Sequence, residues 1–386
     1  MRRRDRYGYH TYYGGSGGPS PVIKVIVIVL AVVVLSLILT IVGLQRYMVY
    51  SSDGGKLVLP WSQQTSEKDE KKPAEDTQEQ KEQKKDKDDA AASSQAPVEE
   101  EPAPENPAVT AIRVSQEDLM SGKVTDILER HKANGAVLEM KAPSGQLSYI
   151  SEQKLATVTG SSWQAKASAE EDEREGDPVA DAIRKFKADH KDTYLIAYVD
   201  CFEDELVGKQ EEYAILTHSG YRWRGPNDEI RWGSPSNADV RAYIVGIVGE
   251  LADMGFDEIM LYNAGYPTDG HLNYIRKDEA YDESQFANVI GDFYTEAAKA
   301  ANDKDARLSV VTKEDTILSG VDEVSGQTLV NLASLDRVWL ERGGNPDVKA
   351  LSEKLTGAGM KRNPVGVLTK YLQKDKDFSQ AVVEEK

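Results

Sequence analysis

The sequence predicts an α/β domain built on parallel strands, preceded by one transmembrane helix and a disordered charged linker. Three observations support this prediction. An uncharged apolar run lies near the N-terminus, a stretch with almost no large apolar residues follows it, and strand-like segments then alternate with amphipathic helical segments. Such alternation is typical of parallel βαβ units, and therefore of a doubly wound sheet or a (β/α) barrel. We expect an anchor, a spacer and one globular domain.

The apolar run, Val25–Leu44, contains 20 uncharged residues. As a helix it is about 30 Å long, which matches the hydrocarbon core of a bilayer. Gln45 and Arg46 follow without the small residues of a cleavage site, so an uncleaved anchor is favoured over a long signal peptide. Basic side chains are concentrated in the Gly- and Tyr-rich tail of residues 1–24. The positive-inside rule therefore predicts a single-pass cell-membrane protein, with residues 25–44 in the lipid bilayer, a cytoplasmic N-terminus and an extracytoplasmic C-terminal domain.

Residues 45–107 are predicted to be a disordered linker. From Trp61 onward this stretch consists mainly of Glu, Lys, Asp, Gln, Ala, Ser and Pro. Such a segment cannot bury enough apolar surface to offset the entropy of ordering it. We interpret it as a spacer between membrane and domain, and we expect a second disordered tail at residues 375–386.

Composition narrows the class of protein. The chain has 47 basic and 65 acidic residues, a formal net charge of −18, which argues against binding nucleic acid. Cys201 is its single cysteine, so no intrachain disulfide can form, which favours a bacterial origin for an extracytoplasmic domain. We expect Cys201 to be a buried small apolar residue. The five histidines are scattered, so we expect no metal site and no cofactor.

The globular domain is predicted to span residues 108–374, a length that suits a (β/α)8 or TIM barrel. Seven strands are predicted at Val109–Val114, Ala136–Met140, Tyr194–Val199, Glu258–Tyr262, Leu308–Val311, Arg337–Leu340 and Val365–Leu368. The eighth is missing, hidden in Asp315–Val330, or supplied at the C-terminus. Helices are predicted at Asp118–Lys132, Pro178–His190, Ala238–Met254, Glu283–Ala301 and Asp347–Thr356.

Polar residues follow the predicted strands. In either architecture the carboxyl ends of the strands carry the chemistry. Carboxylates from several strands fall there, as glycoside chemistry requires, because two carboxyl groups flank the bond that is broken. Asp257 and Glu258 lie at the opposite end and are predicted to be structural. Trp223 and Trp232 flank a Gly-Pro-Asn turn and either offer flat faces to a sugar or pack the loop against the barrel.

Four stretches carry a family resemblance: GAVLEMKAPSGQLSY (Gly135–Tyr149), TYLIAYVDCFEDEL (Thr193–Leu206), YRWRGPNDEIRWGSPSNADVRAY (Tyr221–Tyr243) and GFDEIMLYNAGYPTDG (Gly255–Gly270). Their order and spacing resemble a bacterial family assigned to the glycoside hydrolases with a TIM-barrel domain. The resemblance implies a barrel that acts on polysaccharide or descends from enzymes that do. It also implies an acidic residue where this chain has Tyr262, and another where it has Val311, so the chain is a divergent member.

These observations define the predicted site. Candidate catalytic residues are Glu139, Asp200, Tyr262 and Glu341; candidate substrate-binding residues are Lys141, Asp204, Tyr221, Trp223, Trp232, Asn263 and Asp269. Because the usual acids are replaced, we expect binding of envelope or external polysaccharide with weak or no turnover. The alternatives are an active glycosidase with relocated carboxylates and an envelope scaffold that binds a protein partner, whose identity the sequence does not reveal.

Overall fold

The computed structural model describes residues 48–51, 54–57, 105–162, 176–226, 229–341, 343, 346–361, 363–374 and 376–383. The chain divides into two compact units, Met1–Ser94 and Gln95–Lys386. In the first unit, β1 (Met48–Ser51) and β2 (Gly54–Leu57) form an antiparallel ladder. These residues fall within the predicted disordered linker, so the prediction of disorder is corrected for these two short strands. The predicted span 25–44 lies outside the described residues, among which no helix is long and apolar enough to cross a membrane.

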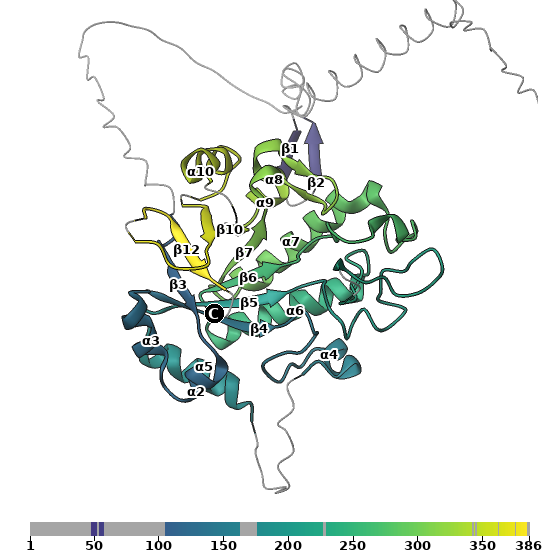
Figure 1. The fold of residues 1–386 in the computed structure, drawn as a ribbon. Helices are drawn as coiled ribbons and strands as arrows, with labels where there is room; N and C mark the ends of the chain where they lie inside the picture. The colour runs from purple at the N-terminus through teal and green to yellow at the C-terminus, as the bar shows by residue number, and fades with distance from the viewer. Residues whose placement is uncertain are drawn as a thin grey trace, which may run out of the picture. The chain divides into compact units, whose positions relative to one another are not determined.

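The second unit is a closed barrel of eight parallel strands (Figure 1). Around the barrel the order is β10-β11-β12-β3-β4-β5-β6-β7, and closure occurs where β12 pairs with β3. Because the sheet closes on itself, the fold is a barrel and not the open doubly wound sheet that the sequence also allowed. The strands are β3 (Thr110–Arg113), β4 (Gly135–Lys141), β5 (Tyr194–Asp200), β6 (Glu258–Tyr262), β7 (Arg307–Thr312), β10 (Arg337–Leu340), β11 (Val365–Leu368) and β12 (Ser379–Val382).

Helices lie on the outside of the barrel (Figure 1). Two helix ends lie where the sequence predicts them. Asp177 caps the helix that begins with Pro178, and Gly255, with φ +103°, ends the helix Ala238–Met254. The helices are α2 (Gln116–Met120), α3 (Val124–His131), α4 (Lys154–Thr159), α5 (Pro178–Asp189), α6 (Ala238–Met254), η3 (Leu272–Tyr274), η4 (Glu283–Gln285), α7 (Phe286–Asn302), α8 (Glu314–Ser319), α9 (Leu329–Ala333) and α10 (Val348–Gly357).

The seven predicted strands are present, and the eighth is β12, at the C-terminus. Its position corrects the predicted tail 375–386, because Ser379–Val382 are paired on both sides in the barrel. The stretch Asp315–Val330 instead contains α8 and a hairpin of β8 (Val321–Asp322) and β9 (Gln327–Thr328). The predicted helix Asp118–Lys132 is divided into α2 and α3, because Gly122 between them has φ +72°.

Two apolar clusters form the core. One contains helix residues and the outward-facing strand residues, and the other fills the barrel interior with residues such as Val137, Met260 and Trp339. Trp339 is fully buried, and it explains a glycine on the neighbouring strand. A Cβ at Gly366 would lie 2.4 Å from the Trp339 ring, so no other residue fits there without a shift.

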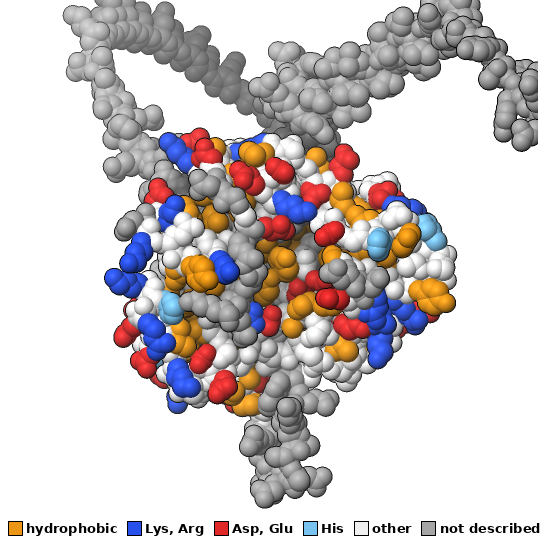
Figure 2. Space-filling model, in the orientation of Figure 1, with side chains coloured by type: hydrophobic (Ala, Val, Ile, Leu, Met, Phe, Trp, Pro, Cys, Tyr) orange, Lys and Arg blue, Asp and Glu red, His pale blue; other side chains and the backbone are white. Residues whose placement is uncertain are grey.

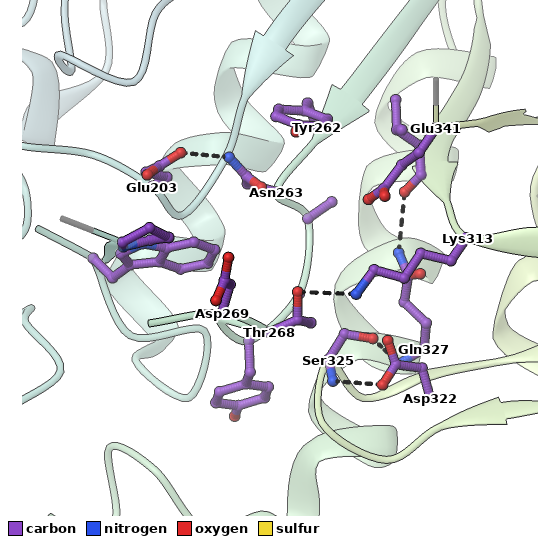
Figure 3. A pocket seen from close by; sticks show the side chains of 16 residues that line it. Glu203, Tyr262, Asn263, Thr268, Asp269, Lys313, Asp322, Ser325, Gln327 and Glu341 are labelled. Carbon is purple, nitrogen blue, oxygen red and sulfur yellow. Dashed lines mark hydrogen bonds between the residues drawn. The ribbon is translucent and has the colours of Figure 1, made fainter. Parts of the chain in front are cut away.

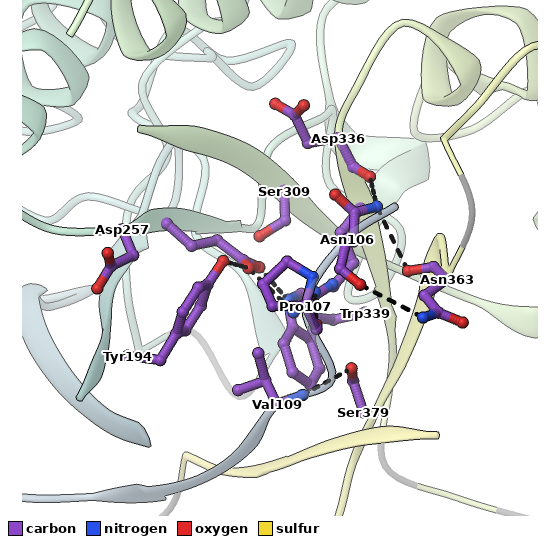
Figure 4. Close-up of polar contacts among 12 residues, drawn as sticks. Asn106, Pro107, Val109, Tyr194, Asp257, Ser309, Asp336, Trp339, Asn363 and Ser379 are labelled. Atoms are coloured by element: carbon purple, nitrogen blue, oxygen red, sulfur yellow. Dashed lines mark hydrogen bonds and ion pairs between the residues drawn. The ribbon is translucent and has the colours of Figure 1, made fainter. Parts of the chain in front are cut away.

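The amino end of the barrel is closed by a buried polar network (Figure 4). Arg337 and Glu258 form an ion pair of 3.1 Å in which neither side chain is exposed. Glu258 also accepts hydrogen bonds from Trp339 Nε1 at 2.6 Å and from the Tyr194 hydroxyl at 2.8 Å. Asp257 pairs with Lys187 at 2.6 Å. The predicted structural roles of Asp257 and Glu258 are therefore confirmed.

Residues Asn106 and Pro107 form a strap across this same end of the barrel (Figure 4). The Asn106 amide donates to the Asp336 carbonyl at 2.6 Å, and Arg337 Nη2 donates to the Pro107 carbonyl at 2.6 Å. Asn106 is 1% exposed. The folded domain thus begins before residue 108, the predicted boundary.

Candidate functional site

A cavity of ≈ 430 Å³ opens at the carboxyl end of the barrel, beyond β5, β6, β7 and β10 (Figure 3). It lies at the opposite end from the strap. Carboxylates, two side-chain amides, an ammonium group and aromatic rings all line it. Its lining consists of Glu203, Pro226, Trp232, Tyr262, Asn263, Ala264, Gly265, Tyr266, Thr268, Asp269, Val311, Lys313, Asp322, Ser325, Gln327 and Glu341.

Among the carboxyl groups that line the cavity, Glu203 is the one whose pKa is raised by burial. It follows β5, is half-buried, and accepts a hydrogen bond of 2.7 Å from the side-chain amide of Asn263. Burial raises the pKa of Glu203, an effect that the Asn263 hydrogen bond and the Lys141 charge oppose and the Glu229 charge reinforces. A carboxyl group with a raised pKa in a cavity can hold a proton and deliver it.

Asn263 links Glu203 to the residues beneath the cavity. Its amide nitrogen lies 3.2 and 3.1 Å from the two carboxylate oxygens of Asp200, besides its contact with Glu203. Its backbone has φ +46°, a left-handed conformation that asparagine tolerates better than other side chains except glycine. The amide is therefore held where it contacts both carboxyl groups.

Lys141 lies below Asp200 and is completely buried. Its Nζ is 2.8 Å from Asp204 Oδ2 and donates to the carbonyl of Asp200 at 2.8 Å. Burial lowers the pKa of Lys141, but the charges of Asp204, Tyr243 and Asp200 outweigh burial, so the pKa is raised. Burial raises the pKa of Asp200 well above its usual value, although the charge of Lys141 opposes this effect. These three groups form a polar support under the site.

Five of the predicted site residues line the cavity: Tyr262, Glu341, Trp232, Asn263 and Asp269. The other six are not part of this lining, and their roles remain predictions. Glu139 is in an ion pair of 3.0 Å with Arg113 on β3. Asp200, Lys141 and Asp204 are 2%, 0% and 1% exposed, because they are packed together beneath the cavity floor.

The two tryptophans have different environments. Trp223 is 2% exposed, and its Nε1 donates to the His271 carbonyl at 3.1 Å, so it packs the loop. Trp232 is also buried, at 6% exposed, and lies against it edge-on with ring centroids 6.4 Å apart, but it forms part of the cavity wall. Tyr221 is 72% exposed and is not among the residues that line the cavity.

Several lining residues are not among the residues predicted from the sequence. Glu203 lies in the polar run after β5, but nothing in that run indicates which carboxylate faces the cavity. Lys313 donates to Thr268 Oγ1 at 3.1 Å, and the hairpin β8–β9 brings Asp322 and Ser325 to the same wall. These hairpin residues are far along the chain from Glu203 and Asn263, and no sequence pattern shows that they line the same cavity. Within the described part of the chain, no group of three or more His, Cys, Asp or Glu residues is placed to hold a metal ion.

A family comparison agrees with this architecture. The family described as "Putative glycosyl hydrolase domain" matches residues 108–336. The chain belongs to this glycosyl hydrolase family. No curated protein matches the chain. At two lining positions where the sequence resemblance implies acidic residues, this member has Tyr262 and Val311.

Solved structures that match part of the chain include three bacterial proteins. A hypothetical protein from Ruminiclostridium thermocellum ATCC 27405 is 20% identical, with a TM-score of 0.41 over 52% of this chain and 96% of that one. The PgaB (BpsB) glycoside hydrolase domain from Bordetella bronchiseptica is 16% identical, with a TM-score of 0.42 over 68% of this chain and 84% of that one. The GH20 exo beta-N-acetylglucosaminidase from Vibrio harveyi, solved with N-acetylglucosamine, is 12% identical, with a TM-score of 0.43 over 68% of this chain and 41% of that one.

Proposed function

We propose that the cavity at the carboxyl end of the barrel binds a saccharide unit of a cell-envelope or external polysaccharide. The lining supports this proposal, because Trp232 and Tyr262 contribute rings while Glu203, Asn263 and Asp269 contribute polar groups. Rings contact the C–H faces of a sugar, and convergent polar groups bind its hydroxyls, a combination expected of a small-molecule site. Membership of a glycosyl hydrolase family supports the same ligand class.

The replaced acidic positions favour binding with weak turnover. Tyr262 and Val311 line the cavity where acidic residues are implied, and Val311 cannot exchange a proton. Tyr262 stacks on Tyr198, with ring centroids 5.7 Å apart, which restrains its ring. A family member without carboxylates at these positions has to place its acid and base elsewhere in order to react.

Hydrolysis with relocated carboxylates is the second candidate function, and the raised pKa of Glu203 is the observation that favours it. Glu203 and Glu341 lie on opposite sides of the cavity (Figure 3). In this reaction Glu203 gives its proton to the glycosidic oxygen as the C–O bond breaks. Water adds to the anomeric carbon, and the Glu341 carboxylate takes the proton that the water loses. Proton exchange with solvent then restores both groups.

The proposed location is the outer face of the cell membrane, with residues 25–44 as the anchor. The position of the strap is compatible with this location, because Asn106 and Pro107 lie at the end of the barrel opposite to the cavity. Carbonate extraction of membranes and protease treatment of intact cells test this location; release of the full chain by carbonate would contradict it.

One experiment separates binding from turnover. The full chain, in mild detergent, is incubated with purified bacterial wall polysaccharides, and both retention on the polymer and release of reducing ends are measured. Retention without release supports binding alone. Release that is lost in Glu203→Gln but kept in Glu353→Gln, an exposed control on α10, supports hydrolysis. Absence of both retention and release would refute the proposed ligand class.

A further inference from the structure

A lobe beside the cavity carries two exposed tyrosine rings. It is built from the loops that follow β5 and β6: the bridge Leu216↔Arg222 folds the first loop on itself, and the bridge Thr217↔Ile275 joins it to the second. Tyr221 is 72% exposed and Tyr274 is 56% exposed. On the face drawn in Figure 2, hydrophobic and histidine side chains lie among Lys, Arg and acidic side chains on the right of the view, where Figure 1 draws these loops.

The two tyrosines are fixed to one short segment of the lobe. Thr217 donates its backbone N–H to the Tyr221 carbonyl at 2.7 Å, and His218 donates its backbone N–H to the Tyr274 carbonyl at 3.0 Å. The His271 ring stacks on Tyr274, with centroids 5.2 Å apart and an interplanar angle of 27°. The rings are therefore exposed but attached to an ordered backbone, which lowers the entropy lost on binding.

This surface is continuous with the cavity. Asp269 lines the cavity, and Gly270, which follows it, turns with φ +89° against Pro226, a second lining residue. The next residue, His271, is held through its carbonyl by Trp223 Nε1. The chain thus leads from the cavity wall to the stacked His271 and Tyr274 rings within a few residues.

The charges of the lobe favour an uncharged ligand. Arg222 pairs with Glu211 at 3.5 Å, Arg231 pairs with Glu205, and Arg276 pairs with Asp278 at 2.5 Å. Because each of these guanidinium groups already faces a carboxylate, the lobe does not present the concentrated positive charge that a polyanion requires. A neutral chain with apolar faces is the ligand that exposed rings suit.

We propose that Tyr221, His271 and Tyr274 form an aromatic platform that binds the outer units of an uncharged saccharide chain. The inner unit of the same chain occupies the cavity, so this inference rests on the proposed function and extends it from a single sugar unit to a polymer. The platform also assigns a role to Tyr221, which does not reach the cavity lining.

The test compares ligands of two lengths. Calorimetry measures binding of disaccharides and hexasaccharides of β-linked glucose, xylose and N-acetylglucosamine to the full chain in mild detergent. The variant is Tyr221→Ala/Tyr274→Ala, and Tyr371→Ala, which removes a ring that is 55% exposed outside the lobe, is the control. Loss of two ring contacts is expected to weaken hexasaccharide binding about tenfold and to leave disaccharide binding within about twofold.

Each outcome is decisive. Unchanged hexasaccharide binding in the double variant, or equal losses for both lengths, would overturn the platform. Equal losses would mean that the rings act through the cavity. Hexasaccharide binding that needs the two rings, without disaccharide binding in the wild type and without an effect of Asp269→Asn, would support the platform and refute the cavity proposal. If neither length binds, both proposals fail.

Discussion

Replacing Arg337 by methionine removes one half of the ion pair that closes the amino end of the barrel. Arg337 and Glu258 are both completely buried and 3.1 Å apart. The methionine side chain fills much of the same space, so the change removes charge more than volume. Glu258 then keeps only the hydrogen bonds from Tyr194 and Trp339. Burial and the Glu258 charge raise the pKa of Tyr194, so its hydroxyl remains a donor.

The expected cost is large, because a carboxylate is left buried without its counter-charge. Removal of one partner of a buried pair costs about 3–5 kcal/mol. The Pro107 carbonyl also loses the Arg337 hydrogen bond of 2.6 Å, which loosens the strap. If Glu258→Gln is added, the buried charge disappears, and the double variant should recover part of the loss, to within about 1–2 kcal/mol of the wild type.

Urea unfolding of the full chain, followed by tryptophan fluorescence, measures these free energies. The matched control is Arg184→Met on α5, whose pair with Asp181 is 3.4 Å long and exposed. This surface pair should contribute less than about 1 kcal/mol. A free energy of unfolding for Arg337→Met within about 1 kcal/mol of the wild type, or a double variant less stable than the single one, would contradict a stabilising role for this ion pair.

Three further predictions concern stability and use the same assay. Asn106→Ala should lower the free energy of unfolding by about 1–3 kcal/mol, because the Asp336 carbonyl loses its buried donor; no loss would mean that the strap is not part of the fold. Because burial raises the pKa of Asp200, its folded form binds the proton more tightly, so stability falls as pH rises from its unfolded pKa of about 3.9 toward the folded value. Asp200→Asn should remove this decline, and unchanged pH dependence contradicts the assignment. Gly366→Ala should cost about 1–3 kcal/mol through its clash with Trp339, and a neutral change would show that the ring can move.

Much of the barrel can be predicted from the sequence because its signals are local. Seven strands and the ends of helices such as Pro178–Asp189 follow from apolar runs, caps and glycines that lie within a few residues of one another. The eighth strand is harder to predict. Ser379–Val382 is short, lies among charged residues, and becomes a strand only because β11 and β3 offer it hydrogen bonds on both sides.

The site is less predictable, since neighbouring residues in a loop face different directions. Asp200, Glu203 and Asp204 belong to one polar run after β5. The structure buries Asp200 and Asp204 around Lys141 and leaves Glu203 in the cavity, held by Asn263. Composition and order cannot distinguish among the three, because the difference depends on which side chain meets a partner from another strand.

The parallel βα architecture, the family and the end of the barrel where polar residues gather can all be derived from the amino-acid sequence. These follow from periodicity and from motifs that are read along the chain. The closure of the barrel, the carboxylates that face the cavity and the positions of the exposed tyrosines are visible only in the folded molecule. Those features depend on contacts between residues far apart in sequence, such as Thr110 with Gln380 and Thr217 with Ile275, and such contacts leave no pattern in either segment alone.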